Sequence, residues 1–457
     1  MVIKIPPQVN RAIEILEENG HSAYVVGGAV RDAIMGKTAD DWDITTSALP
    51  EETVRAFNGF RVIETGIKHG TVTVIVDGTP LEITTYRIET GYSDNRHPDR
   101  VDFTDRIEVD LSRRDFTVNS IAYSPKRGFA DPFGGKKDID NKLIRSVGEA
   151  DRRFGEDALR ILRALRFSSV LGFEIEPGTA ESIHRNCNSL KNISVERIFV
   201  ELSKLLCGKD AGRILREYED IFFFILPELK PMKNCLQNHE RHIFDVWGHT
   251  VKAVESVEPV PEMRFAMLLH DSGKPHCKIT DENGTDHFYG HSKVSRKIAE
   301  DVLLKLKTST AFRNRICDLV EYHDFLPDKI SKKTYKKYIA KLGYDTVKDL
   351  FEIRKSDISA QNPKFLAEEL VRNESGLKIL EEISSEEKCF KITDLAIGGR
   401  ELVLLGLKPS PKTGKILEIL LDEVMDEKIE NTHEALNERA LQLIKQQERR
   451  DNGNCKN

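Results

Sequence analysis

The strongest constraint on the fold is a change of sequence pattern near residue 140. Between residues 20 and about 140, short β-branched runs alternate with Gly, Asp and Pro, as in DWDIT, GTVTVIVDG and PLEITTYR. Such runs are typical of short strands joined by turns. From about residue 141 onward helical periodicity dominates, and Pro and Gly stand mainly at breaks such as LPELKP and EPVPEM. The pattern predicts an α+β domain built on a small mixed sheet, followed by a nearly all-α remainder.

The chain length and composition indicate a helix-rich globular protein with several domains. A chain of 457 residues is too long for one hydrophobic core, so we expect about three or four domains. The apolar share of 39% and the charged share of 32% are ordinary for this class. We divide the chain into a head (1–140), a neck (141–230), a body (231–375) and a tail (376–457).

Several function classes are disfavoured by the composition. The apolar run IFFFIL is too short to span a bilayer, and the N-terminus has no apolar signal core. Seven cysteines without CxxC spacing indicate neither a disulfide framework nor a cysteine zinc site. A net charge of -6 argues against indiscriminate nucleic-acid binding. We therefore expect a reduced, cytoplasmic protein with no membrane partner.

An acidic cluster, Asp40 to Asp43, interrupts the strand-rich region. If DWDIT is a strand, Asp41 and Asp43 point to the same face, about 6 to 7 Å apart. Two such carboxylates repel each other unless a cation lies between them, and oxygen ligands suit Mg2+. Glu82 could add a third carboxylate from an adjacent strand, although a surface salt bridge is as good an interpretation. A solvated acidic loop is the alternative for the whole cluster.

A glycine pair, Gly27 and Gly28, lies between an expected strand and an expected helix. Glycines at such a turn let backbone N–H groups approach a phosphate closely. Because Arg31 and then the acidic cluster follow, the segment is consistent with a triphosphate site beside a metal ion.

Three motifs together resemble one enzyme family. VVGGAVRDAIMGKTADDWDIT is similar to the signature of class II tRNA nucleotidyltransferases and poly(A) polymerases, which have a polymerase β-like head. SRRDFTVNSIAY (112–123) and the segment from DPFGGKK to RALRF (131–167) are similar to the second and third motifs, in the same order. The resemblance covers roughly residues 20 to 230.

The resemblance implies a tRNA CCA nucleotidyltransferase, which adds or repairs the 3′-terminal CCA from CTP and ATP without a template and releases pyrophosphate. It implies that the catalytic carboxylates are Asp41 and Asp43, both ligands of Mg2+, and that Gly28, Arg31 and Arg114 bind nucleotide. Asp115 and Asn119 would hold ribose hydroxyls or brace the site, with a salt-bridge cluster as the alternative.

GEDALRILRALRF (155–167) is expected to form a helix with one polar face. At about 100° per residue, that face carries the side chains of Glu156, Asp157, Arg160, Arg163 and Phe167. A solvated face with Glu/Asp–Arg pairs is the alternative. The family resemblance implies that Asp157 and Arg160 read the incoming base and that Arg163 and Arg166 contact the nucleotide. Arg166 falls off the arc and is the least secure member.

The segment between the first two motifs (84–103) is polar and rich in turn residues. In the family, a flexible loop here accompanies the final A addition, and enzymes that add only CC have it shortened. The segment therefore favours full CCA addition, or A addition alone, over CC addition.

A second set of residues resembles the HD metal-dependent phosphohydrolases. His249, the His270–Asp271 pair and the distant Asp357 occur in the order typical of that superfamily. Mixed imidazole and carboxylate ligands suit Mn2+, Ni2+ or Mg2+, and further histidines, at His287, His291 and His323, could support a second metal or a phosphate. The resemblance implies a phosphohydrolase side activity, with a purely structural HD fold as the alternative.

The C-terminal segment resembles the family's tRNA-binding end. Lys408, Lys412 and Lys415 lie beside glycines and suit phosphate contacts with the acceptor and T arms of tRNA; exposed lysines at a helix cap are the alternative. An A-adding tRNA nucleotidyltransferase and a poly(A) polymerase are the nearest alternative functions. From a different class, the chain could be an HD phosphohydrolase with a nucleotide-binding head. The sequence leaves the oligomeric state open.

Overall fold

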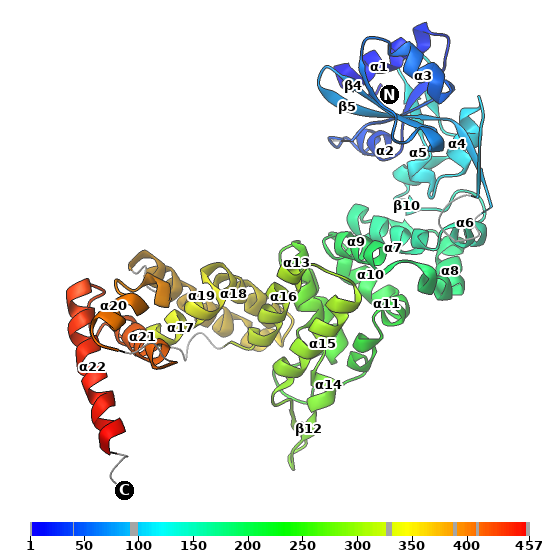
Figure 1. Ribbon diagram of the computed structural model, residues 1–457. Coiled ribbons are helices and arrows are strands. Elements are labelled where there is room, and N and C mark those ends of the chain that lie inside the picture. The colour runs from blue at the N-terminus through cyan, green and yellow to red at the C-terminus, as the bar shows by residue number, and fades with distance from the viewer. Residues whose placement is uncertain are drawn as a thin grey trace. The chain divides into compact units, whose positions relative to one another are not determined.

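The chain folds into two compact units. The computed structural model describes residues 2–39, 41–91, 99–325, 331–386, 391–407 and 411–453. One unit comprises Met1–Lys230 with Leu304–Thr308, and the other comprises Pro231–Leu303 with Ser309–Asn457. Each unit is described by itself below (Figure 1).

A seven-stranded mixed sheet organises the first part of the first unit. Its order is β3-β4-β5-β2-β1-β8-β9, and β2 with β5 is the parallel pair in it. The strands in it are β1 (Ala23–Val26), β2 (Asp43–Thr46), β3 (Arg61–Ile63), β4 (Thr71–Val76), β5 (Thr79–Thr85), β8 (Ala122–Ser124) and β9 (Gly128–Ala130). A separate hairpin pairs β6 (Arg87–Thr90) with β7 (Arg100–Phe103). The predicted α+β head with a small mixed sheet is confirmed.

Strand alternation buries one face of this sheet against helices. In β4, Val72, Val74 and Val76 are buried while the threonines and the isoleucine between them are half-buried, as expected for a strand with one covered face. Helix α1 (Pro7–Glu18) packs on this strand through its own apolar stripe (Figure 1). The other helices around the sheet are α2 (Gly28–Ile34), α3 (Pro50–Ala56), α4 (Ile107–Ser112) and α5 (Gly135–Asp140).

The rest of the first unit is helical and follows the sheet. Its helices are α6 (Ala150–Glu156), α7 (Leu159–Leu171), α8 (Pro177–Asn186), α9 (Val195–Leu206), α10 (Ala211–Glu217) and α11 (Glu219–Ile225). A two-stranded parallel ladder of β10 (Leu143–Ile144) and β11 (Glu174–Ile175) joins them. Helices α7 and α9 pack side by side, because the apolar face of α7 includes the fully buried Ile161, Ala164 and Leu165.

The second unit is built from helices. They are α12 (Val246–Ser256), α13 (Pro261–Leu269), α14 (Lys274–Cys277), α15 (His291–Lys305), α16 (Thr310–Tyr322), α17 (Lys332–Leu342), α18 (Tyr344–Ser359), α19 (Pro363–Glu386), α20 (Gly399–Leu404), α21 (Pro411–Met425) and α22 (His433–Gly453). A small hairpin of β12 (Ile279–Thr280) and β13 (Asp286–His287) lies between α14 and α15. The expectation of a nearly all-α remainder is thereby confirmed.

Two cores stabilise this unit. Helices α12, α13, α16 and α18 pack on one another, and the last three helices share a separate apolar cluster that includes Leu402, Leu420 and Leu436. Among the residues described in either unit, none of the helices combines the length and the apolar character that crossing a bilayer requires. The four-part division of the chain with boundaries at 140 and 375 stays a prediction.

Candidate functional site

The predicted strand at the acidic cluster is shorter than expected. Strand β2 begins at Asp43, so Asp41 and Trp42 precede it. The reason is the length of the neighbouring strand: Val26 ends β1 and is the register partner of Asp43, so no ladder remains for residues 41 and 42. Trp42 Nε1 instead donates a hydrogen bond to the carbonyl of Ala39 (3.1 Å). Both carboxylates are exposed at the start of the strand.

A third carboxylate lies beside Asp43 in the sheet. Ile44 of β2 is paired with Ile83 of β5, so the residues before them, Asp43 and Glu82, are neighbours on the same exposed face. Partial burial raises the pKa of Asp43, the charges of Asp41 and Glu82 raise it further, and that of Arg114 opposes them. Like charges therefore gather here, where a divalent cation would be favoured.

Arg114 brings a guanidinium to the glycine turn. Gly27 has a φ of +79°, a backbone conformation that favours glycine, and a Cβ on it would lie only 3.1 Å from Nη1 of Arg114. The Nε of Arg114 is buried without a hydrogen-bond partner. Burial lowers the pKa of Arg114, while Asp110, Asp43 and Asp115 raise it. A positive group with unused donor capacity thus lies next to Asp43 and the turn.

One hydrogen-bond network joins all three motifs. Arg31 donates from Nη1 to Oδ1 of Asn119 (2.6 Å), and Asn119 donates from Nδ2 to Oδ1 of Asp115 (3.2 Å). Arg163 donates from Nε to Oδ2 of Asp115 (2.8 Å). Burial raises the pKa of Asp115, but the charge and hydrogen bonds of Arg163 outweigh it and lower the pKa to about 2. Asp115 and Asn119 therefore brace Arg31 and Arg163.

We predict that Asp115→Asn lowers the free energy of unfolding of the first unit by about 2 to 3 kcal/mol at pH 7. This value follows from the difference between the carboxyl pKa of about 2 in the folded state and 3.8 in the unfolded state. A lowered carboxyl pKa stabilises the fold above the unfolded pKa, and the effect is lost as the pH falls from about 4 toward 2. The difference between wild type and variant should therefore shrink by roughly half between pH 7 and pH 3.

Urea unfolding can be followed in one unit at a time, because the two tryptophans of the chain are Trp42 and Trp247 and lie in different units. In a Trp247→Phe background, Trp42 fluorescence reports on the first unit. A difference between wild type and Asp115→Asn that is independent of pH would contradict the ion-pair account.

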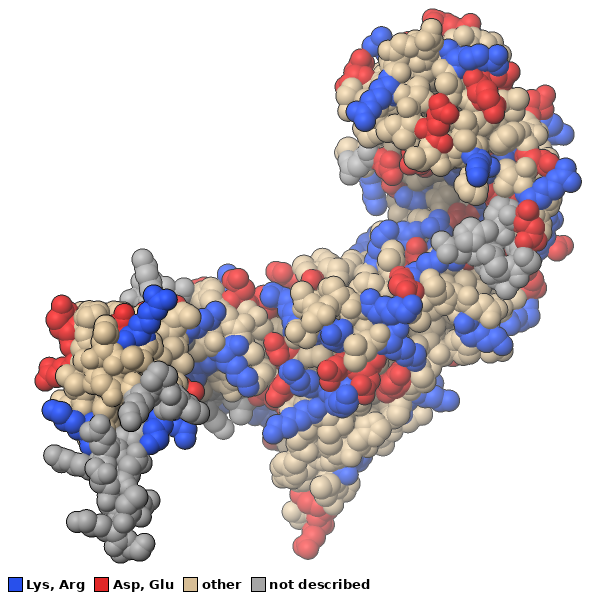
Figure 2. Space-filling view, viewed as in Figure 1, with Lys and Arg blue, Asp and Glu red and all other residues tan. Residues whose placement is uncertain are grey.

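Phe167 and Glu201 also belong to this site, although the sequence analysis did not identify them as contacts of its arginines. Phe167 is buried, and the guanidinium carbons of Arg31, Arg163 and Arg166 lie 5.3, 5.4 and 3.9 Å from its ring centre. Arg166, which falls off the predicted arc, donates from Nε to Oε2 of Glu201 on α9 (2.6 Å). Figure 2 shows Lys and Arg side chains gathered over the region of α7 and α9.

The predicted single helix over 155–167 is interrupted. Helix α6 ends at Glu156, Asp157 is extended (φ −145°, ψ 104°) and α7 begins at Leu159. The break is stabilised by Asp157 itself, because its Oδ1 accepts from the Leu159 N–H (3.0 Å) and its Oδ2 accepts from Nη2 of Arg197 (2.8 Å). The arc drawn through an unbroken helix was therefore wrong for Glu156 and Asp157.

Arg160 is fixed from several sides in the same region. Its Nη1 donates to Glu156 (2.8 Å) and to the carbonyl of Arg153 (3.2 Å), and its Nη2 donates to the carbonyl of Arg113 (3.1 Å). Nε and the second Nη2 hydrogen are not used in these bonds. Asp157 and Arg160 are thus held rigidly by other groups, each with capacity left for a ligand.

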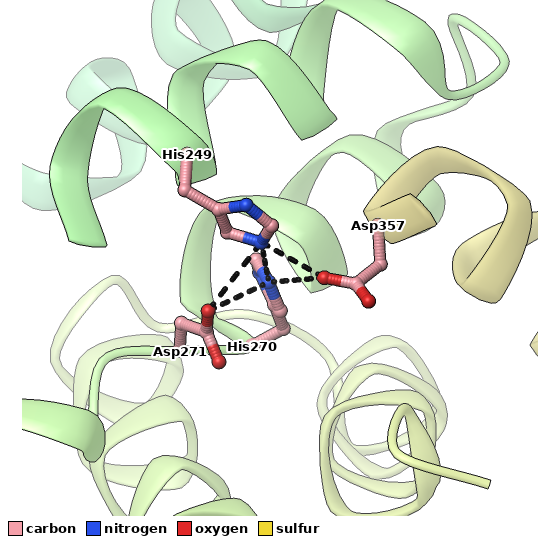
Figure 3. Close-up of side chains that lie close together, drawn as sticks. All are labelled: His249, His270, Asp271 and Asp357. Carbon is pink, nitrogen blue, oxygen red and sulfur yellow. Dashed lines mark hydrogen bonds and ion pairs between the residues drawn. The ribbon is translucent and has the colours of Figure 1, made fainter. Parts of the chain in front are cut away.

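The second unit brings the four predicted HD residues together (Figure 3). His249 comes from α12, His270 and Asp271 follow α13, and Asp357 comes from α18; one ligand atom of each lies within 4.8 Å of all the others. His249 Nε2 is 2.8 Å from Oδ1 of Asp357, and His270 Nε2 is 3.2 Å from Oδ2 of Asp271. All four side chains are buried.

A second cluster shares one residue with the first. Asp271, His291 and His323 also offer ligand atoms within 4.8 Å of one another. Both carboxylate oxygens of Asp271 are buried without a partner in hydrogen-bonding geometry, although Lys274 Nζ lies 2.7 Å from Oδ2. Imidazole nitrogens and carboxylate oxygens gathered in one buried cluster are ligands that suit divalent metal ions, so the donor set fits such an ion.

The charges in this cluster are strongly coupled. Burial lowers the pKa of His270, but Asp271 and Asp357 outweigh it and raise the pKa to about 10. Burial raises the pKa of Asp271, but His270 and Lys274 lower it well below the usual range. Among the residues that the structure describes, both clusters of three or more such ligands lie in this unit, and the carboxylates of the head form no such cluster.

Comparison with protein families places each part of the chain. Residues 23–145 match the poly A polymerase head domain, residues 172–233 match the probable RNA and SrmB-binding site of polymerase A, and residues 287–440 match the putative tRNA nucleotidyltransferase domain 2. A head with this sheet, the acidic pair and the glycine turn is that of a nucleotidyltransferase.

Comparison with individual relatives identifies the family within the nucleotidyltransferases. The chain is 33% identical over 437 residues to a CCA-adding enzyme of Lactobacillus delbrueckii subsp. bulgaricus, covering 96% of this chain and 98% of that protein. It is 46% identical over 223 residues to that of Ligilactobacillus salivarius, covering 48% of this chain and 55% of that protein. The crystal structure of the Bacillus stearothermophilus CCA-adding enzyme in complex with CTP superposes with a TM-score of 0.73 at 27% identity, covering 98% of this chain and all of that one. The chain belongs to the family of CCA-adding enzymes.

Proposed function

We propose that this protein adds the terminal CCA to tRNA, transferring CMP twice and AMP once from CTP and ATP. The observation that carries the proposal is the network through Asp115, which joins the glycine turn, the RRD segment and α7 into one nucleotide site beside Asp43. The likeness over nearly the whole chain to a CCA-adding enzyme supports it.

In this proposal Asp41 and Asp43 hold Mg2+, with Glu82 as a candidate third carboxylate. The cation would activate the terminal 3′ hydroxyl of the tRNA and neutralise charge on the departing pyrophosphate. Gly28, Arg31 and Arg114 bind the nucleotide, and Arg114, whose Nη1 lies beside the glycine turn and whose Nε has no hydrogen-bond partner, has donor capacity left for a phosphate oxygen. Arg163 and Arg166 contribute positive charge on the opposite wall.

Asp157 and Arg160 select the base. Cytosine and adenine both show an exocyclic amino donor beside a ring-nitrogen acceptor, which matches a carboxylate acceptor and a guanidinium donor. Guanine and uracil have the opposite polarity and would leave both groups unpaired, which is expensive in a buried site. The rigid hold on both side chains, from Arg197 and from the Arg113 carbonyl, supports this role.

The tRNA contacts of the tail stay a proposal. Lys412 and Lys415 lie in α21; the side chain of Lys412 is half-buried and that of Lys415 is exposed. Both would contact phosphates of the acceptor and T arms. Lys408 lies outside the described residues. The predicted loop 84–103 includes the hairpin β6–β7, and its residues 92–98 are likewise outside the described range.

One assay tests the proposal against its alternatives. Three forms of a tRNA, ending at the discriminator base, at C and at CC, are offered each labelled nucleoside triphosphate singly and together. We expect growth to CCA and a stop there. A long A tail would indicate a poly(A) polymerase, and failure to use CTP would indicate an A-adding enzyme.

A second candidate function rests on the buried cluster in the other unit. We propose that His249, His270, Asp271 and Asp357 hold one divalent cation, Mn2+, Ni2+ or Mg2+, and that this centre hydrolyses phosphoesters as a side activity. A His270→Ala variant is expected to lose this cation but to retain nucleotide transfer. Loss of transfer in this variant would show that the second unit carries the main chemistry.

A further inference from the structure

Three arginines from two parts of the first unit lie around the ring of Phe167. Arg31 comes from α2, directly after the glycine turn, whereas Arg163 and Arg166 come from α7. The guanidinium carbon of Arg166 is the nearest, at 3.9 Å from the ring centre, and those of Arg31 and Arg163 lie at 5.3 and 5.4 Å. The ring is 7% exposed. It therefore lies where the sheet and the helices that follow it bring their cations together.

The ring of Phe167 is fixed by a second aromatic side chain. It packs edge to face against Phe116, with ring centres 5.8 Å apart and planes at 78°. Phe116 is fully buried, and its backbone N–H donates a hydrogen bond to Oδ1 of Asp115 (2.8 Å). The position of Phe167 is thus determined by apolar packing on the second motif and does not depend on the arginines.

Each of the three guanidinium groups also has a polar partner. The partners are Asn119 for Arg31, Asp115 for Arg163 and Glu201 for Arg166, at 2.6, 2.8 and 2.6 Å. A guanidinium has five N–H groups, and these bonds leave several of them unused. In the hydrogen bonds between described residues, Arg166 donates from Nε alone. The group keeps donor capacity for a ligand.

Gathering these cations has an electrostatic cost. Burial lowers the pKa of Arg166, the charge of Glu201 opposes this change, and the charge of Arg163 lowers the pKa further. The negative face of an aromatic ring attracts cations, and the attraction is larger where they are desolvated. A ring accepts no conventional hydrogen bond from them, so it offsets part of the repulsion and leaves their N–H groups unused.

Resting on the nucleotide site proposed above, we propose that Phe167 is a positioning residue for the triphosphate of the incoming nucleotide. Its ring holds three guanidinium groups together by cation–π attraction and leaves their charge and their remaining N–H groups to phosphate oxygens. A carboxylate in its place would neutralise the arginines and occupy their donors. An aliphatic side chain would fill the space without attracting them. In this role Phe167 acts through the arginines and touches no reacting atom.

Stepwise fluorination of the ring tests the proposal with little change in shape. In the full-length protein, Phe167 is replaced by mono-, di- and trifluorinated phenylalanine, which weaken the negative face of the ring progressively. The Kd of labelled CTP is measured by equilibrium dialysis with Mg2+ and without tRNA, so that no transfer takes place. We expect the Kd to rise with each added fluorine, by about 10-fold over the series.

Two controls separate attraction from packing. The same series is made at Phe154, a fully buried ring of α6 that takes part in none of the cation–π contacts between described residues, and it should leave the Kd of CTP unchanged. Inorganic triphosphate is used to displace labelled CTP. Its affinity should fall in step with that of CTP in the Phe167 series, because the arginines act on the phosphates.

The outcomes distinguish this role from the nucleotide site itself. A Kd that is independent of fluorination, or that changes as much in the Phe154 series, would overturn the role of Phe167 while CTP binding stands. A change for CTP without one for inorganic triphosphate would assign the effect to the base and also overturn the role. If the unaltered protein binds no CTP, the nucleotide site fails and this role fails with it.

Steady-state transfer provides a second readout. Phe167→Leu should raise the KM for CTP and for ATP about 10-fold, with kcat and the KM for tRNA changed by no more than about twofold. Phe167→Tyr, which keeps an aromatic ring, should restore the KM. A purely structural role would reduce the amount of folded enzyme, which lowers the apparent kcat and leaves each KM unchanged. That result would overturn the proposal.

Discussion

Replacing Asp43 with alanine is expected to reduce the transfer of CMP and AMP to tRNA by about 1,000-fold or more, equivalent to roughly 4 kcal/mol of transition-state stabilisation. Asp43 begins β2 with Asp41 before it and Glu82 beside it, so its removal takes away one of the two proposed cation ligands. Single-turnover incorporation of labelled CMP into a tRNA ending at the discriminator base measures the effect. Binding of the tRNA, measured separately, should be largely kept.

A stability readout distinguishes this account from simple unfolding. Because the pKa of Asp43 is raised, its ionised form destabilises the fold above the unfolded pKa, and the destabilisation disappears when the pH falls below that value. Asp43→Asn should therefore melt no lower than wild type at pH 7 without divalent ions. Asp77→Asn, an exposed carboxylate of the same unit paired with Arg11, is the matched control and should transfer normally. An inactive Asp77→Asn, or an active Asp43→Ala, would contradict the assignment.

Replacing Asp157 with alanine is expected to lower the preference for CTP over UTP by about 100-fold. A site that hydrogen-bonds its substrate rejects the wrong polarity by leaving buried groups unpaired, and this rejection needs the carboxylate acceptor. The measurement is kcat/KM for each of the four nucleoside triphosphates, on tRNA ending at the discriminator base and at CC.

The matched control for base selection is Asp151→Ala. Asp151 is an exposed carboxylate on α6 that pairs with Arg185, so its removal changes the charge equally near the same helix break. Its selectivity should equal that of wild type. If Asp157→Ala slows all four nucleotides to the same degree, the residue acts only as the cap of α7 and not as a selector.

Much of the fold could be predicted from local patterns. The alternation in GTVTVIVDG predicted β4, because strand period depends on neighbours in the chain. The resemblance of three motifs to one enzyme family implied the nucleotidyltransferase head. The HD order likewise indicated a cation site, although His249 and Asp357 are separated by 108 positions.

Other features could not be predicted because they depend on distant partners. Nothing in the local sequence shows that the helix breaks at Asp157, since its stabilising partner Arg197 comes from another helix. The grouping of Arg31, Arg163 and Arg166 around Phe167 likewise depends on how α7 packs beneath the sheet domain.

The sequence by itself determined the class of the protein: a turn-rich sheet with an acidic pair, then helices, with motifs in the order of one family. Only the tertiary structure decided which functional side chains lie next to one another. It made β2 begin at Asp43, because the antiparallel strand β1 beside it ends at Val26, the register partner of Asp43. It also turned the two oxygens of Asp271 to opposite pairs of histidines. Periodicity along a chain sets which face a side chain occupies, whereas its partners across helices are set by packing in three dimensions.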